Sequence, residues 1–241
     1  AGTMGDFGVF SFHSHKNIST LGEGGMLTVH SEELARLVPG LRHNGVRPYP
    51  LGRDKFWLPA MSDVDFDIDR VWPYNYCIGE VQCALGVKLL ERLDSINARR
   101  RKRAKRIVAA LADFPELQFQ KVPTDCGHVF HLLSARYDGA SHGASRDQFI
   151  ERMAFKHKVK VIVQYHPLYR YPLFIKAGFG GADCPNTDAF YDNMVSFPFH
   201  LWLKERQIDH MIAAARETLA SLRAPRKGRL LSPRIREIAR R

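Results

Sequence analysis

Small and aromatic residues alternate at the beginning of the chain. Residues 5–13 (GDFGVFSFH) therefore predict a strand. Its two faces are formed by Phe7, Val9 and Ser11 on one side and by Gly8, Phe10 and Phe12 on the other. Both faces look buried, and such a strand needs neighbours at its edges. A glycine-rich loop then leads to a second predicted strand at 25–29, and Ser31 begins a short helix over residues 31–41.

The middle of the chain has the period of a helix. From Glu80 to Phe114 apolar residues recur every three or four positions, and Pro115 ends the predicted helix. After it, alternation predicts strands at 119–122, 128–137 and 159–165, and helical spacing predicts helices at 146–157 and 204–223. This second half predicts a small α+β domain packed against the long helix.

The composition is that of an ordinary globular protein, with 45% hydrophobic residues. No apolar run has the length of a membrane helix, and no signal peptide is visible, so we expect a cytoplasmic protein with reduced cysteines. The net charge is +11, but residues 224–241 hold seven Lys or Arg and one Glu, which gives +6 of it. We interpret this basic tail as flexible or as a weak terminal helix.

Two charged segments and two histidine pairs could carry other chemistry. The basic run 98–106 (ARRRKRAKR) could contact nucleic-acid phosphates, but it lies in a helical pattern, so we expect a solvated helix face. Residues 62–69 (SDVDFDID) lack the glycine turn and distal glutamate of a calcium loop, and we expect a solvated loop or an edge strand. The histidine pairs 13/15 and 128/131 do not form a convincing metal site, so no metal is expected.

The most informative residue is Lys16, which follows the first strand and precedes Gly22-Glu23-Gly24-Gly25. A lysine amine that is taken out of water has a lowered pKa and can condense with an aldehyde. Ser11 could present its hydroxyl to a phosphate, and the glycines allow close approach of the backbone. An ordinary surface lysine fits the same spacing, so spacing alone leaves both interpretations open.

Several motifs share one resemblance. The segment GTMGDFGVFSFHSHKNISTLGEGGM resembles the lysine motif of the DegT-type (DegT/DnrJ/StrS) nucleotide-sugar aminotransferases, a fold-type I family that depends on pyridoxal phosphate. Further segments resemble the same family: WPYNY at 72–76, QCALG at 82–86, RLDSINARRRKRA at 92–104, YHPLYRYPLF at 165–174 and DNMVSFPFH at 192–200. The resemblance covers residues 2–223.

The resemblance implies an α/β fold that is the C-terminal part of a fold-type I PLP-dependent aminotransferase. Residues 1–75 would be the remainder of the large PLP-binding domain with the Schiff-base lysine. Residues 76–223 would form the long connecting helix and the small C-terminal α+β domain, and 224–241 the basic flexible tail.

The same resemblance implies an activity and site residues. The reaction would be transfer of an amino group from Glu or Gln to a keto group of a nucleotide-linked sugar, for cell-surface polysaccharide or related sugar biosynthesis. Lys16 would bind pyridoxal 5'-phosphate and shuttle the proton, and Ser11 would bind the cofactor's phosphate. Asn75 would reach the phosphate of the neighbouring subunit's cofactor, which implies a homodimer with shared active sites.

Two departures from the family pattern keep alternatives open. Cys77 stands where the family usually has arginine, and the part of the large domain that supplies the aspartate for the pyridinium nitrogen is not among these residues. We therefore expect a fragment, and a truncated non-catalytic partner or pseudo-enzyme is one alternative. A nucleic-acid-binding protein that uses the basic helix and tail is another. A related dehydratase is disfavoured, because those relatives have histidine in place of the lysine.

Overall fold

The computed structural model describes residues 2–46, 57 and 72–223 of the 241-residue chain. These residues divide into two compact units, with the boundary between Ile96 and Asn97. The first unit contains a two-stranded sheet and the second a three-stranded sheet.

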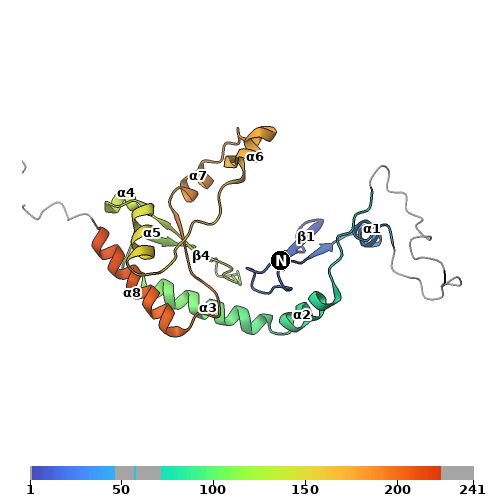
Figure 1. The fold of residues 1–241 in the computed structure, drawn as a ribbon, viewed down its shortest axis with the longest axis horizontal. Coiled ribbons are helices and arrows are strands. Elements are labelled where there is room, and N and C mark those ends of the chain that lie inside the picture. Colours follow the sequence, from blue (N-terminus) through green and yellow to red (C-terminus); the bar gives the residue numbers. More distant parts are fainter. Residues whose placement is uncertain (1, 47–56, 58–71, 224–241) are drawn as a thin grey trace, which may run out of the picture. The chain divides into compact units, whose positions relative to one another are not determined.

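The described part of the first unit is a hairpin with two helices. Its elements are β1 (Phe7–Ser11), β2 (Gly25–Val29), α1 (Glu32–Arg42) and α2 (Glu80–Leu90), coloured blue to teal in Figure 1. The strands are antiparallel, with Phe7 opposite Val29 and Ser11 opposite Gly25. Ser31 caps α1, because its hydroxyl accepts a hydrogen bond from the backbone N–H of Leu34. The two predicted strands and the predicted start of the helix are therefore confirmed.

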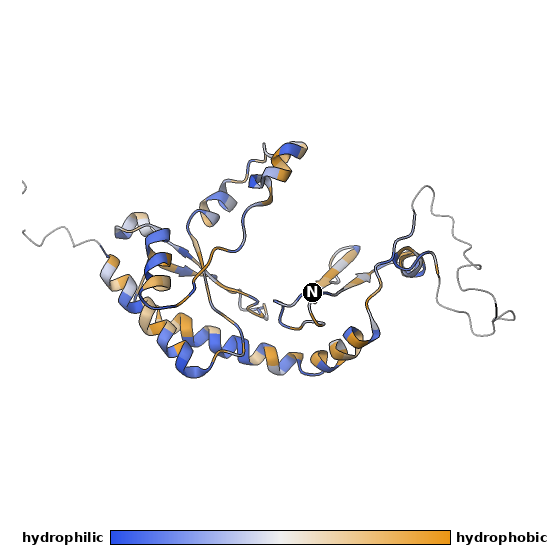
Figure 2. Ribbon diagram, viewed as in Figure 1, coloured by the Kyte–Doolittle hydropathy of each residue, from blue (hydrophilic) through white to orange (hydrophobic). Residues whose placement is uncertain are grey.

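One face of the hairpin is apolar and open to solvent. Phe7, Val9 and Leu27 lie on this apolar hairpin face, with exposed fractions of 53%, 81% and 43%. The prediction that both faces of the first strand are buried is wrong for the described residues, because β1 pairs only with β2 and no described element covers Val9. Helix α2 also has no buried residue, although Figure 2 shows hydrophobic residues along much of it.

The long helix predicted from Glu80 to Phe114 is interrupted. It consists of α2 and of α3 (Leu93–Ala110), with a turn at residues 91 and 92. In this turn the Arg92 N–H donates to Leu89 O, three residues earlier, rather than to the residue four earlier. The apolar period continues across the turn, so the pattern of residues did not reveal the break.

The described part of the second unit is an antiparallel sheet with helices. The strand order is β3-β4-β5, with β4 in the centre. Its elements after α3 are β3 (Leu117–Phe119), β4 (Leu133–Tyr137), α4 (Gly139–His142), α5 (Arg146–Phe155), η2 (Leu168–Arg170), α6 (Pro172–Phe174), η3 (Ile175–Phe179), α7 (Pro185–Tyr191), β5 (Met194–Phe197) and α8 (Glu205–Leu222).

The core of this unit is formed by α3, α5 and α8 together with the sheet (Figure 1). The rings of Tyr137 and Phe149 stack at 5.2 Å between their centroids. The largest apolar side chains that are fully buried are Ile107, Leu111, Tyr137, Phe149, Met153, Val195, Ile208 and Leu219. Burial of each such side chain contributes about 1.5–3 kcal/mol. The helices predicted at 146–157 and 204–223 are confirmed as α5 and α8.

The strand predicted at 159–165 is wrong. This segment makes a single bridge, between Ile162 and Ser196, and it does not form a longer ladder. The strand predicted at 128–137 begins only at Leu133, because Phe130 has a positive φ of 44°, which interrupts an extended backbone.

The basic run 98–106 is exposed at Arg99, Lys102, Lys105 and Arg106, as the predicted solvated face requires, but it turns inward at Arg100. Arg100 is 6% exposed, and its guanidinium donates to three backbone carbonyls, those of Phe130, His131 and Phe199 at 2.8, 2.8 and 3.1 Å. Arg103 and Arg106 form ion pairs with carboxylates at the start of α8. The reason is tertiary: segments beside β4 and β5, distant in sequence, present carbonyls that the guanidinium of Arg100 reaches.

Two predictions lie outside the described residues, namely the loop or edge strand at residues 62–69 and the flexible tail 224–241. In the described part of the chain, no helix is long and apolar enough to cross a membrane. The described residues also contain no group of three or more His, Cys, Asp or Glu placed to hold a metal ion.

Candidate active site

The antiparallel register of β1 and β2 continues beyond both strands. Two further backbone hydrogen bonds of 2.8 Å extend the ladder, from Phe12 N–H to Gly24 O and from Ser14 N–H to Gly22 O. They place His13 directly opposite Glu23. The Gly-Glu-Gly-Gly motif is therefore the partner segment of the stretch that leads to Lys16.

Lys16 lies in a turn just beyond this ladder. Its N–H donates to His13 O at 2.9 Å, which closes a four-residue turn. The side chain is half-buried, and its Nζ takes part in no hydrogen bond or ion pair with the residues that the structure describes. Such an amine can act as a nucleophile in its unprotonated form.

Thr20 fixes the loop between Lys16 and the glycines. It is 2% exposed, its N–H donates to Phe12 O at 3.0 Å, and its hydroxyl donates to Glu23 O at 2.9 Å. A Cβ at Gly24 would lie 2.1 Å from Thr20 Oγ1, so only glycine fits there. Gly22 has a φ of 117°, which also favours glycine. Sequence reasoning missed Thr20, because a loop residue has no periodic signal.

Ser11 occupies the last position of β1 and is exposed. Its Oγ accepts a hydrogen bond from the N–H of His13 at 3.4 Å. Ser11 and Lys16 thus belong to one local structure, the end of the hairpin. This end offers a hydroxyl and a primary amine.

His13 makes several contacts inside the turn. Its Nδ1 accepts from the N–H of His15 at 3.3 Å, and its Nε2 lies 3.4 Å from Ser14 Oγ and 3.7 Å from Glu23 Oε1. The rings of His13 and His15 meet edge to face at 4.9 Å. His13 is therefore the side chain that links both sides of the hairpin end.

Asn75 lies in a different part of the first unit. It forms an antiparallel bridge with His43, just after α1, and its Oδ1 accepts from the Cys77 N–H at 3.3 Å. Asn75 and Cys77 are both exposed. The bridge of Asn75 thus joins it to the end of α1, whereas the contacts of Ser11 and Lys16 are within the hairpin.

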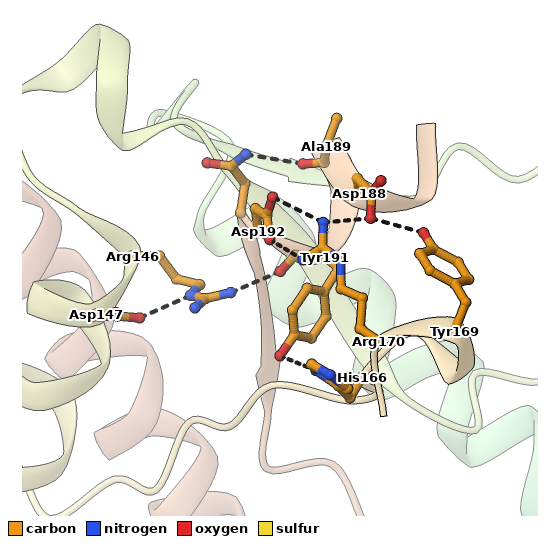
Figure 3. Close-up of polar contacts among 10 residues, drawn as sticks. Arg146, Asp147, His166, Tyr169, Arg170, Asp188, Ala189, Tyr191 and Asp192 are labelled. Carbon is orange, nitrogen blue, oxygen red and sulfur yellow. Dashed lines mark hydrogen bonds and ion pairs between the residues drawn. The ribbon is translucent and has the colours of Figure 1, made fainter. Parts of the chain in front are cut away.

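An ion-pair cluster in the second unit connects the segment around Arg170 to α7 (Figure 3). The Arg170 guanidinium pairs with Asp188 and Asp192, and the Tyr169 hydroxyl donates to Asp188 at 2.8 Å. Desolvation and the hydrogen bond with Asp188 raise the pKa of Tyr169 to about 12. The hydrogen bond from Arg170 lowers the pKa of Asp192. At neutral pH the cluster is thus charged and paired.

Tyr191 extends this cluster through its ring and hydroxyl (Figure 3). The hydroxyl lies 2.7 Å from His166 Nδ1, and the guanidinium carbons of Arg146 and Arg170 lie 5.9 and 5.3 Å from the ring centroid. These contacts join residues 165–174, one of the segments that carry the family resemblance, to α7. An open hollow of about 410 Å³ in the same unit is lined by residues around the start of α5 and contains neither Lys16 nor Ser11.

Comparison with known proteins agrees with the motifs. A family model described as the DegT/DnrJ/EryC1/StrS aminotransferase family matches residues 1–216. The spore coat polysaccharide biosynthesis protein SpsC of Bacillus subtilis (strain 168) is 30% identical over 218 residues, which are 90% of this chain and 54% of that protein. The GDP-perosamine synthase of Caulobacter vibrioides is 28% identical over 221 residues, covering 91% of this chain and 54% of that protein.

Solved structures show the same fold. Helicobacter pylori PseC, an aminotransferase involved in the biosynthesis of pseudoaminic acid, matches with a TM-score of 0.76 and 23% identity over 92% of this chain and 55% of its own. The sugar aminotransferase Spr1654 of Streptococcus pneumoniae, in its PMP-form, matches with a TM-score of 0.75 and 24% identity. This match covers 92% of this chain and 55% of Spr1654. The predicted fold class, the C-terminal part of a fold-type I aminotransferase, is confirmed. The chain spans about half the length of the curated relatives it matches.

Proposed function

Because the chain belongs to the DegT/DnrJ/EryC1/StrS aminotransferase family, as its motifs predicted, we propose that it acts in amino-group transfer with pyridoxal 5'-phosphate as cofactor. Lys16 is the residue that holds this cofactor covalently. The observation that carries the proposal is the hairpin end, where a turn closed on His13 presents an amine without a partner among the described residues.

The donor set of the hairpin end fits such a cofactor. Pyridoxal phosphate supplies an aldehyde that bonds to amines and a ring that withdraws electrons from the bonded carbon. Lys16 would hold the cofactor through its Nζ, which reacts with such an aldehyde in its unprotonated form. When its Nζ is free, Lys16 would also move the proton of the reaction. The Ser11 hydroxyl binds the phosphate.

The substrate class follows from the relatives. Their names include a GDP-perosamine synthase, a dTDP-3-amino-3,4,6-trideoxy-alpha-D-glucose transaminase of Micromonospora megalomicea and a spore coat polysaccharide biosynthesis protein. The acceptor is accordingly a keto group on a nucleotide-linked sugar, and the donor is Glu or Gln. The aminated sugar serves cell-surface polysaccharide or related sugar biosynthesis.

We propose a domain organisation along the chain that the described part of the first unit supports. Residues 1–75 belong to the large cofactor-binding domain, 76–223 form the connecting helix region and the small domain, and 224–241 form a basic tail. The exposed apolar hairpin face is what a piece of a larger sheet presents. Coverage of about half of the relatives is consistent with a large domain that includes further polypeptide.

Asn75 supports a shared site. Its side chain is exposed, and its Nδ2 has no partner among the described residues, so it is able to donate to a phosphate held by the neighbouring subunit. The protein is a homodimer in this proposal. Its location is cytoplasmic, where cysteines such as the four free ones of this chain stay reduced.

The test is covalent attachment of the cofactor to Lys16. The chain is mixed with pyridoxal phosphate, reduced with borohydride and digested, and the modified lysine is identified by mass spectrometry. We expect the adduct at Lys16 and its loss in Lys16→Ala. Lys88→Ala is the matched control, since Lys88 lies on α2 and pairs with Glu91 just beyond it, and the substitution should leave the adduct unchanged.

The outcomes separate the functional alternatives. An adduct spread equally over surface lysines, and unchanged in total by Lys16→Ala, would refute the proposal. A specific adduct at Lys16 without any transfer from glutamate or glutamine to a keto sugar would favour a non-catalytic family member. The nucleic-acid alternative gains nothing from Arg100, Arg103 and Arg106, whose guanidinium groups contact carbonyls and carboxylates within the unit.

A further inference from the structure

Glu23 lies opposite His13, and the carbonyl of His13 closes the turn that carries Lys16. Antiparallel residues that are directly opposite have their side chains on the same face of the ladder, within reach of each other. His13 and Glu23 occupy such a position, and Nε2 of His13 lies 3.7 Å from Oε1 of Glu23. The glutamate of the Gly-Glu-Gly-Gly motif therefore faces the residue whose carbonyl anchors the lysine turn.

The contacts of His13 fix its ring. Because Nδ1 accepts from the N–H of His15, the ring proton of neutral His13 is on Nε2, toward Glu23 and the Ser14 hydroxyl. Rotation of the ring would break the contact with His15. Removal of the Glu23 charge would weaken the attraction that keeps Nε2–H pointing toward Glu23. The ring thus connects the glycine-rich segment to the turn.

We propose that His13 and Glu23 are positioning residues for Lys16, a role that rests on the proposed function. Neither side chain needs to touch the cofactor or the substrate. Glu23 holds the ring of His13, the ring holds the N–H of His15, and the carbonyl of His13 holds the N–H of Lys16. Together these contacts fix the direction in which the Lys16 side chain leaves the turn.

Three substitutions separate the contacts of the pair. His13→Asn keeps an acceptor near the place of Nδ1, His13→Gln keeps a donor near the place of Nε2, and Glu23→Gln removes only the charge. Glu23 is 85% exposed in its side chain, so Glu23→Gln leaves folding intact. His30→Asn and Glu33→Gln are matched controls outside the turn, since both residues are exposed.

The first measurement is amide hydrogen exchange of His15 and Lys16 without cofactor. Loss of the Nδ1 acceptor in His13→Gln should speed exchange of the His15 amide about fivefold, the factor expected for one ordinary hydrogen bond. His13→Asn should restore slower exchange. The second measurement is the pyridoxal phosphate concentration that half-saturates borohydride trapping at Lys16. Glu23→Gln should raise it about threefold, because the neutral amide of glutamine attracts the Nε2–H of His13 less strongly than the carboxylate does.

The two measurements distinguish the two proposals. If the unsubstituted protein gives no specific adduct at Lys16, the proposed function fails, while the exchange data still decide the role of His13 in the turn. If the adduct forms and His13→Gln and Glu23→Gln match the controls in exchange and in trapping, the positioning role is overturned. Rescue of trapping by His13→Asn but not by His13→Gln supports the role of His13, and weaker trapping in Glu23→Gln than in Glu33→Gln supports the role of Glu23.

Discussion

Replacing Gly24 by alanine tests whether the lysine turn depends on Thr20. The new Cβ would lie 2.1 Å from Thr20 Oγ1, a distance that unbonded atoms do not reach, so one of them must move. Thr20 is buried and tied by hydrogen bonds to Phe12 O and Glu23 O, so the movement opens the loop. We expect Gly24→Ala to destabilise the hairpin end by about 1–3 kcal/mol, the usual range for overpacking.

A second substitution should relieve the first. Thr20→Ala removes the clashing Oγ1, after which the nearest atom of residue 20 is its Cβ at 3.4 Å, an ordinary contact. Alone, Thr20→Ala loses the hydrogen bond to Glu23 O, which costs about 1 kcal/mol. The double variant should therefore be more stable than the sum of the two single effects by about 1–2 kcal/mol.

The assay is amide exchange of the two N–H groups that extend the ladder, those of Phe12 and Ser14, in the four proteins of this cycle. The trapped adduct at Lys16 is a second readout, which should fall in Gly24→Ala and recover in part in the double variant. Gly127→Ala is the control, because nothing lies within 4 Å of an added Cβ there. Strictly additive effects, or normal exchange in Gly24→Ala, would show that Thr20 does not hold the turn.

Two further predictions concern the second unit. Arg100→Met removes three hydrogen bonds, but it also removes the cost of burying a cation, a burial that lowers the pKa of Arg100. We therefore expect the second unit to lose about 2–3 kcal/mol of stability, measured by exchange of the β4–β5 amides. A loss equal to that of the exposed control Lys102→Met would contradict this prediction. Burial raises the pKa of Glu116, but the hydrogen bonds and charge of Arg223 outweigh burial and keep the pKa below 4.5. Since a carboxyl with a depressed pKa stabilises the fold above its unfolded pKa and loses that effect as pH falls through the folded pKa, unfolding temperatures should drop below about pH 4.5, and Glu116→Gln should flatten that drop. Identical pH profiles for the two proteins would contradict this assignment.

The predictable features were those encoded over a few neighbouring residues. Alternation predicted the first strand of the hairpin, and the glycine-rich loop marked the start of the second. Ser31 marked the start of α1 because a serine hydroxyl can accept from an N–H in the first turn. The lysine motif pointed to Lys16 and Ser11, which the structure places in one hairpin end.

Contacts between distant residues were not predictable. The direction of Arg100 depends on carbonyls at positions 130, 131 and 199, and the charge pattern of a helix contains no information about them. Thr20 and the pairing of His13 with Glu23 depend on a register that continues beyond the strands, and that register is evident only when the hydrogen bonds of the loop are known.

The lysine turn and the apolar hairpin face are stabilised by different contacts. The hydrogen bonds that define the lysine turn lie within residues 11–25, although Ile78 and Gly86 also lie close to Gly24 and Thr20. The apolar hairpin face is different, since Val9 is 81% exposed and gains its apolar stabilisation only when further polypeptide covers it. A two-stranded hairpin is marginally stable by itself. The direction of Lys16 is thus set locally, whereas its stability in a working site depends on the surface that covers β1 and β2.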